Sequence, residues 1–193
     1  GKRQADELII KGLERLEYRG YDRAGIAIMN DTLTIHKKAG KVKALRELIK
    51  EENTTGNLGI GHTRWATHGE PNDRNAHPHM GNSGRLALVH NGIIENFKEL
   101  RAELASHGIT FVTETDTETV ALLCEFNMRD GSSPVEAARK TVARLDGAFA
   151  LAFLFDGEED LLIAARKGSP LAIGHGDGEM YVGSDAIALA PMT

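Results

Sequence analysis

The chain has 193 residues, of which 41% are hydrophobic and 26% are charged, and its formal net charge is −5 at pH 7. This balance is typical of a soluble globular protein, and the length is sufficient for one domain with a sizeable core. The acidic balance argues against a general nucleic-acid-binding protein, because binding to phosphates requires a basic face. The sequence contains no signal-peptide pattern and no run of about 18 to 20 apolar residues, so we expect a cytoplasmic protein without a membrane partner.

Helices and strands alternate in the first part of the chain. Apolar residues recur at helical spacing near the start of the sequence, which predicts an amphipathic helix. Two short β-branched stretches separated by Asn30 and Asp31 indicate a hairpin. The elements expected here are a helix over residues 4–17, strands over 24–29 and 32–36, a helix over 42–50 and a strand over 58–63.

A polar loop over residues 69–84 opens the second part of the chain. This loop is too long for a simple connection, and it is rich in His and Asn. We expect Thr115 or Asp116 to cap one of the helices that follow. The remaining expected elements are a strand over 85–90, helices over 95–106, 117–128 and 134–145, and strands over 147–155, 161–166, 171–175 and 180–183.

Cys124 is the only cysteine, which excludes an internal disulfide and a multi-cysteine zinc site. Its neighbours from Val120 to Leu123 are apolar. We therefore expect a buried, inert thiol rather than a nucleophile.

The segment from His62 to Gly69 holds the densest group of polar side chains. It contains two histidines, an arginine, two threonines and the only tryptophan of the chain. Such a density is unusual for a segment that only fills a core, so we expect it to belong to a functional site.

Histidines raise the possibility of a metal site, because five of the eight lie between His62 and His90. A catalytic zinc needs three protein ligands and an open position. The pair His77 and His79 lacks a nearby carboxylate partner, and the proline between them restricts the two rings. We favour structural histidines and no metal, and keep a metal hydrolase built on His62, His77 and His79 as an alternative.

The dipeptide Asn91-Gly92 follows the strand expected over residues 85–90. A side-chain amide beside a glycine N–H at a strand end can aim two donors at one point, as an oxyanion hole requires. Asn-Gly is also the commonest hairpin turn. Ile93 and Ile94 lead toward a helix rather than a returning strand, so we favour the oxyanion hole.

Residues 113–118 alternate threonines with acidic residues. This pattern is either a capped helix start or a binding site for a cation. In the second reading, Asp116 would meet an α-ammonium group while Arg64 holds a carboxylate through its planar guanidinium. Together these charges would match a free amino acid.

Five motifs of the chain resemble one family. They are Tyr18-Arg19-Gly20-Tyr21-Asp22, residues 62–71, Asn75-Ala76-His77-Pro78-His79, Val89-His90-Asn91-Gly92-Ile93-Ile94-Glu95-Asn96 and Glu114-Thr115-Asp116-Thr117-Glu118. On these motifs the chain is similar to the glutaminase domain of glucosamine-6-phosphate synthases, class II glutamine amidotransferases also called glutamine:fructose-6-phosphate aminotransferases (isomerizing). The resemblance extends over essentially the whole chain, and related amidotransferases such as amidophosphoribosyltransferases share only looser versions of these motifs.

The resemblance implies a fold and a reaction. The fold is α+β, the N-terminal-nucleophile hydrolase fold, a four-layer αββα sandwich of two antiparallel sheets between helical layers, with residues 1–193 as one glutaminase domain. In the reaction, an N-terminal cysteine attacks the side-chain amide of glutamine, with its own α-amine as base, and the glutamyl thioester is hydrolysed to glutamate. Ammonia then passes to a sugar isomerase domain, where fructose-6-phosphate becomes glucosamine-6-phosphate. The resemblance implies no cofactor, and a homodimer for the full-length enzyme.

Carried over position by position, the resemblance also implies roles for single residues. Arg64 would hold the α-carboxylate of glutamine, and Asp116 its α-ammonium group. The Asn91 side-chain amide and the Gly92 N–H would bind the tetrahedral oxyanion. The other expected residues are Thr67 and His68 at the same end of the substrate, Trp65 as a cover, and Arg19, His62 and His77 as supports.

The chain departs from the family pattern in two places. The family's nucleophile begins a Cys-Gly-Ile-Val-Gly strand that would directly precede Gly1, so we expect the chain as given not to hydrolyse glutamine. The alternative is a non-catalytic glutamine-binding or interaction domain that has lost the nucleophile. Arg23 stands where the family usually has serine, which is either a surface substitution or an altered loop near the active site.

Overall fold

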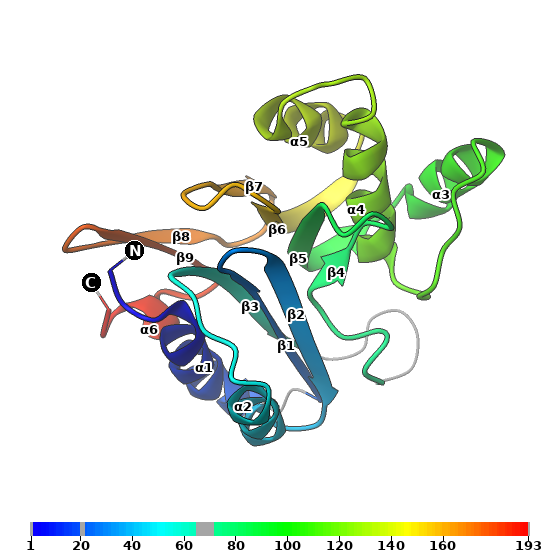
Figure 1. The fold of residues 1–193 in the computed structure, drawn as a ribbon. Coiled ribbons are helices and arrows are strands. Elements are labelled where there is room, and N and C mark those ends of the chain that lie inside the picture. Colours follow the sequence, from blue (N-terminus) through cyan, green and yellow to red (C-terminus); the bar gives the residue numbers. More distant parts are fainter. Residues whose placement is uncertain (1, 20–21, 65–71, 193) are drawn as a thin grey trace.

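The computed structural model describes residues 2–19, 22–64 and 72–192. The N-terminal part of the chain forms the first sheet (Figure 1). Strand β1 (Arg23–Met29) pairs antiparallel with β2 (Leu33–Ala39) on one side and β3 (Leu58–Arg64) on the other. Helices α1 (Ala5–Leu16) and α2 (Val42–Glu51) cover the outer face of this sheet through a cluster of buried aliphatic side chains. A 3-10 turn, η1 (Glu17–Arg19), ends the first helix.

The second sheet comes from the later part of the chain. Its antiparallel order is β4 (His79–Met80), β5 (Leu86–Ile94), β6 (Gly147–Phe155) and β7 (Leu162–Lys167). Helices α3 (Phe97–Ser106), α4 (Asp116–Asn127) and α5 (Pro134–Ala143) lie on its outer side and share the largest apolar cluster with β5 and β6. Thr115 caps α4, since its hydroxyl accepts the Glu118 backbone N–H.

The inner faces of the two sheets pack against each other. Strand alternation sends Leu86 and Leu88 to the helical side and Ala87 and Val89 to the other sheet, where they meet Ile60. The molecule therefore has four layers: helices, sheet, sheet and helices (Figure 1).

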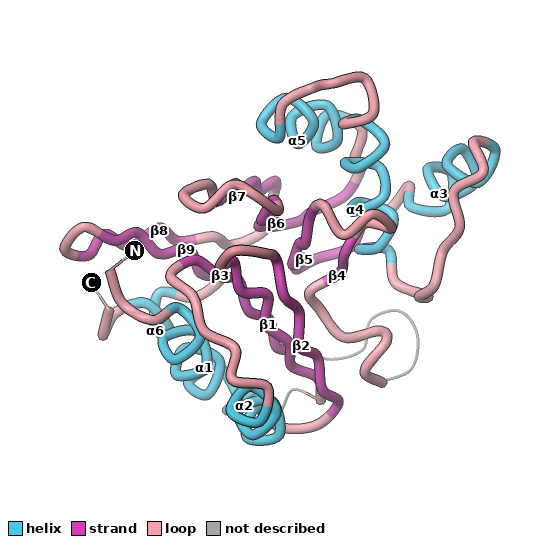
Figure 2. Tube along the Cα trace, in the orientation of Figure 1, coloured by secondary structure: helices cyan, strands magenta, loops and turns pink. Residues whose placement is uncertain are grey.

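The C-terminal hairpin returns to the start of the chain. Strands β8 (Ala172–Gly176) and β9 (Glu179–Gly183) pair with each other, and α6 (Ala186–Leu189) follows beside α1 (Figure 2). Arg3 Nε donates to Glu179 Oε1 at 2.7 Å, and its guanidinium also donates to the Tyr181 hydroxyl. These bonds hold the segment before α1 against β9.

The expected elements are confirmed, but strands β2 and β5 are longer than expected and two short elements are additional. Strand β2 continues to Ala39 because it pairs with β1 up to Arg23. Strand β5 continues to Ile94 because β6 pairs with it up to Gly147. The two-residue β4 was not predicted, because it is defined only by its pairing with β5. The four-residue α6 was not predicted either. Among the described residues, no helix is long and apolar enough to cross a membrane.

Gly25 provides a test of how tightly the loop that contains His77 packs on β1. A Cβ atom at Gly25 would lie 1.7 Å from the His77 carbonyl oxygen, which is backbone and cannot move aside cheaply. We predict that Gly25→Ala lowers the free energy of unfolding by about 1–3 kcal/mol. Gly12→Ala on α1 is the control, because its new Cβ would meet only the flexible end of Met192, and it should stabilise by about 0.5–1 kcal/mol. Urea denaturation measures both, and an unchanged Gly25→Ala protein would contradict the packing.

Cys124 provides a test of the core packing. The structure confirms that this residue of α4 is buried, within the largest apolar cluster. Burial raises the pKa of the thiol from 9.0 to about 11. We predict no reaction of the native protein with a maleimide at mildly alkaline pH, and rapid reaction in concentrated guanidinium, both measured by mass spectrometry. Fast labelling of the native protein would contradict the burial.

The raised pKa of Cys124 also predicts a pH dependence of stability. Because the thiol ionises at a lower pH in the unfolded chain, the free energy of unfolding should fall as the pH rises from about 9 toward about 11.

Candidate active site

Polar side chains from both sheets converge where β3, β5 and the start of α4 meet. His62 comes from β3, Asn91 and Gly92 from β5, and Asp116 from the first turn of α4. His62 and Asp116 are buried, whereas Asn91 and Gly92 are partly accessible. The site thus combines two buried side chains with a pair of residues that solvent can reach.

His62 holds the side-chain amide of Asn91. Its Nε2 lies 2.7 Å from Asn91 Oδ1 and 2.9 Å from the backbone oxygen of His90. Because both partners are acceptors, Nε2 carries a proton and donates to both oxygens. The Asn91 Nδ2 group makes no hydrogen bond within the described part of the chain, so its two N–H donors are available to another group.

Gly92 occupies a position that only glycine fits. Its φ is +107°, and a Cβ atom there would lie 2.1 Å from the Ala148 carbonyl oxygen. The prediction that Asn91 and Gly92 lie at a strand-to-loop corner is wrong, since both residues lie inside β5 and pair with β6. They are not a hairpin turn either, and the positive φ locally breaks the regular strand geometry at the backbone N–H of Gly92.

Asp116 is bound to the strand that carries Asn91. Its Oδ2 accepts the Ile94 backbone N–H at 2.9 Å, and its Oδ1 lies 3.9 Å from His90 Nδ1. The carboxylate is 1% exposed and lies in the first turn of α4. One hydrogen bond therefore fixes the spacing between Asp116 and the donors on β5.

The Thr117 hydroxyl joins two of the buried imidazoles. Its Oγ1 lies 2.7 Å from His77 Nε2 and 2.9 Å from His90 Nδ1. The His77 ring stacks on that of His62, with centroids 4.3 Å apart and an angle of 26° between the planes. His79 Nε2 contacts the Thr115 hydroxyl at 3.0 Å. The histidines thus form a packed layer between β3 and the start of α4.

This packing bears on the metal-hydrolase alternative. Within residues 2–19, 22–64 and 72–192, no three His, Cys, Asp or Glu side chains are grouped so that they could hold a metal ion. The rings of His62 and His77 stack face to face, and His77 meets His79 edge to face. Each ring also has a hydroxyl or carbonyl partner.

Arg23 lies inside the molecule, so its interpretation as a surface substitution is wrong. It is 2% exposed, and one guanidinium nitrogen donates to the Asn75 backbone oxygen at 2.9 Å. Burial lowers the pKa of the guanidinium, and the Asp22 carboxylate 3.7 Å from Nε opposes that effect. Asn75 in turn exchanges hydrogen bonds with Glu114, so Arg23 connects β1 to the segment that leads into Asp116.

Several expected site residues cannot be placed. Trp65, Thr67 and His68 lie outside the described residues. Arg64 ends β3 opposite Arg23, and Arg19 ends η1, but only their backbones are described. The structure therefore brings together Asn91, Gly92, Asp116, His62 and His77, and leaves the other expected contacts to glutamine as predictions.

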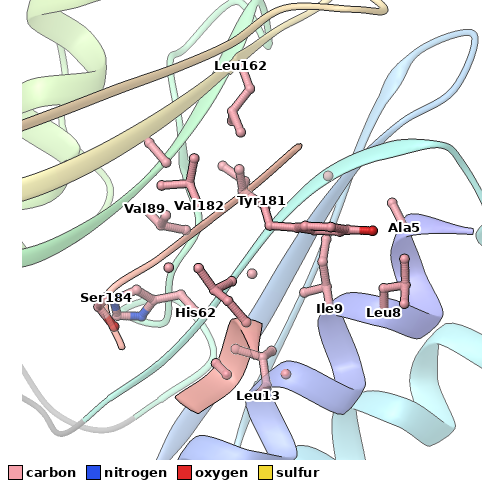
Figure 3. Close-up of a pocket in the computed structure, with 18 of the residues that line it drawn as sticks. Ala5, Leu8, Ile9, Leu13, His62, Val89, Leu162, Tyr181, Val182 and Ser184 are labelled. Carbon is pink, nitrogen blue, oxygen red and sulfur yellow. The ribbon is translucent and has the colours of Figure 1, made fainter. Parts of the chain in front are cut away.

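An apolar cavity of about 240 Å³ runs along β3 and ends beside this group. In Figure 3, His62 and Ser184 lie at one end of the cavity, and Ala5 and Leu8 lie at the other. Among the described residues, β3 pairs only with β1, so its other edge faces the cavity. Asn91 also lines the cavity, which could therefore accept an extended chain segment whose end reaches Asn91.

Sequence reasoning missed the parts played by Thr117 and Asn75. Both lie within motifs that the resemblance covers, but neither residue type signals a contact with a distant segment. The alternation of threonines at positions 113, 115 and 117 was the available signal, since three hydroxyls near a helix start exceed what capping needs.

The chain matches a known sequence family. The family described as "Glutamine amidotransferase domain" matches residues 62–191. Glutamine–fructose-6-phosphate aminotransferase (isomerizing) of Mesorhizobium japonicum is 57% identical over 194 residues, which cover 100% of this chain and 32% of that protein. The protein of the same name from Brucella suis is 59% identical over 186 residues, covering 96% and 30%. The chain spans about a third of the length of the curated relatives it matches.

Solved structures agree with this match. Glutamine phosphoribosylpyrophosphate amidotransferase from B. subtilis, complexed with ADP and GMP, has a TM-score of 0.83 at 31% identity, covering 98% of this chain and 41% of that one. A structure described as the allosteric regulatory enzyme of purine biosynthesis has a TM-score of 0.83 at 30% identity, covering 95% and 40%. This likeness confirms the expected α+β fold of N-terminal-nucleophile hydrolases. With the match over residues 62–191, it follows that the chain belongs to the family of glutamine amidotransferase domains.

Proposed function

We propose that this domain is the glutaminase part of a glucosamine-6-phosphate synthase. It would hydrolyse glutamine to glutamate and ammonia through a cysteinyl thioester. The observation that carries the proposal is the hydrogen bond that ties Asp116 to β5, because it holds a buried carboxylate at a set distance from the Asn91 and Gly92 donors. The names of the relatives support the same reaction.

The substrate contacts follow from the chemistry of glutamine. Asp116 takes the α-ammonium group and Arg64 the α-carboxylate, so the two charges orient the side chain toward β5. Thr67 and His68 line the charged end, Trp65 covers the pocket, and Arg19 supports the nucleophile, as the family resemblance implies. Binding both charges also selects a free amino acid over a glutamine within a peptide.

The reaction then places negative charge at β5. A thiolate sulfur bonds to the side-chain carbonyl carbon, and the electron pair of the C=O bond moves to oxygen. The Asn91 Nδ2–H and the Gly92 N–H stabilise that oxyanion. Collapse breaks the C–N bond and releases ammonia with the proton taken from the thiol by the α-amine. Water then hydrolyses the thioester to glutamate.

The thiolate has to come from a cysteine other than Cys124. Cys124 lies on α4 in the largest apolar cluster, its pKa is raised by burial, and it does not line the cavity that Asn91 lines. The cavity along β3 supports a different source, because an extended segment lying there could pair with the open edge of β3 and end beside Asn91. The family's Cys-Gly-Ile-Val-Gly strand has the small and apolar side chains that this cavity would accept.

Adding that strand tests the proposed reaction. We predict that a protein in which Cys-Gly-Ile-Val-Gly precedes Gly1, with the cysteine at the free N-terminus, releases glutamate and ammonia in equal amounts from glutamine. The matched control carries alanine in place of that cysteine and should release neither. If the cysteine form is folded but inactive, glutaminase activity is refuted, and saturable glutamine binding by calorimetry would then favour the non-catalytic binding domain.

Asp116 gives a test of the substrate contacts. We predict that Asp116→Asn raises the KM for glutamine about 10- to 100-fold, because a charge-assisted hydrogen bond of about 1.5–3 kcal/mol is lost. Asparagine can still accept the Ile94 N–H, so the fold should be kept. Glu125→Gln is the control on the same helix, since that carboxylate binds Ser83 and should leave KM unchanged. An unchanged KM for Asp116→Asn would remove Asp116 from the site.

We further propose that the full-length protein uses this ammonia for aminosugar synthesis. A sugar isomerase domain would combine the ammonia with fructose-6-phosphate in a cytoplasmic homodimer, and residues 1–193 would act as a single glutaminase domain. The name shared by the relatives supports fructose-6-phosphate as the substrate, and their roughly threefold greater length supports a further domain.

A further inference from the structure

We infer that His62 is a positioning residue that orients the Asn91 amide for the oxyanion. The inference rests on the proposed function, because it assumes that Asn91 Nδ2 meets the oxyanion. It concerns the atoms of the His62 ring rather than any direct contact of His62 with glutamine.

The backbone oxygen of His90 sets the protonation of the His62 ring. This oxygen lies 2.9 Å from Nε2 and can only accept a hydrogen bond, so Nε2 must carry a proton. If the proton were on Nδ1 alone, the lone pairs of Nε2 and of the carbonyl oxygen would face each other. The backbone of β5 therefore selects the Nε2–H tautomer.

The Nε2–H group in turn selects one orientation of the Asn91 amide. Asn91 Oδ1 lies 2.7 Å from Nε2 and accepts its hydrogen. The amide rotated by half a turn would bring the Nδ2 hydrogens against the Nε2 hydrogen, which is repulsive. Oδ1 thus stays on the ring, and Nδ2 with both of its hydrogens points to the other side.

Packing prevents the His62 ring from turning away. The ring is stacked on His77, whose Nε2 contacts the buried Thr117 hydroxyl. The His77 backbone lies against Gly25, the cross-strand partner of His62 on β1. His62 is 6% exposed, so water cannot easily replace it as a donor to Asn91. The amide is therefore oriented before substrate binds.

This arrangement affects the transition state more than substrate binding. The oxyanion exists only after the nucleophile has attacked, so a misoriented Asn91 amide lowers kcat and leaves the KM for glutamine nearly unchanged. Removing an oxyanion donor costs about 100- to 1000-fold in kcat. Loss of orientation alone should cost less, about 10- to 100-fold, since the amide still samples the productive rotamer.

The test compares His62→Gln with His62→Asn in the protein that carries the N-terminal cysteine. A glutamine amide nitrogen reaches roughly the position of Nε2 and can donate to Asn91 Oδ1, whereas the shorter asparagine places the same group near Nδ1. We expect His62→Asn to lower kcat about 10- to 100-fold with KM within about 2-fold, and His62→Gln to recover most of kcat. Adding Asn91→Ala to His62→Asn should cost no more than Asn91→Ala alone.

Three results would overturn the inference. The first is an unchanged kcat in His62→Asn, and the second is an equal loss in both His62 variants at equal thermal stability. The third is the Nδ1–H tautomer of His62, found by nitrogen-15 NMR in the protein that carries the N-terminal cysteine. This measurement does not require an active enzyme. If the protein with the N-terminal cysteine is inactive, the proposed function fails, and with it the role of His62 in catalysis. The NMR tautomer then still decides whether His62 Nε2 donates to Asn91 and so orients the amide.

Discussion

The hydrogen bond from the Ile94 N–H to the Asp116 carboxylate connects the two elements on which the site depends. A carboxylate that is 1% exposed would be costly without compensation, and it receives a backbone donor together with the positive end of a helix. The bond forms only because α4 packs on β5 through the largest apolar cluster of the molecule. Core packing on one side of the sheet thus sets the geometry of polar groups at its edge.

The two sheets contribute different parts of the same site. The second sheet supplies Asn91 and Gly92, and the first supplies the ring of His62 that holds the Asn91 amide. Small side chains such as Ala27 and Ala87 let the sheets approach closely, so a side chain on β3 can reach the backbone of β5. The buried histidines are polar groups that the interior tolerates because each has a hydrogen-bond partner.

Local patterns predicted most of the fold, and the errors occur where distant pairing decides. The spacing of apolar residues and the turn residues were sufficient to predict α1, the β1–β2 hairpin and α4. They were insufficient for the length of β5, which depends on pairing with β6, and for β4, which depends on Leu88. The same reason explains Arg23, whose burial follows from Asn75 on a segment 52 residues later.

The amino-acid sequence by itself determined the family, the order of helices and strands, and the chemical groups from which an amide-hydrolysing site could be built. Local periodicity and motif spacing carry that information, because they depend on neighbouring residues. Only the tertiary structure decided which way the Asn91 amide faces, which nitrogen of His62 carries the proton, and that Asp116 is anchored to β5. These are properties of hydrogen bonds between residues 22 to 29 positions apart, and such bonds exist only after the layers have packed.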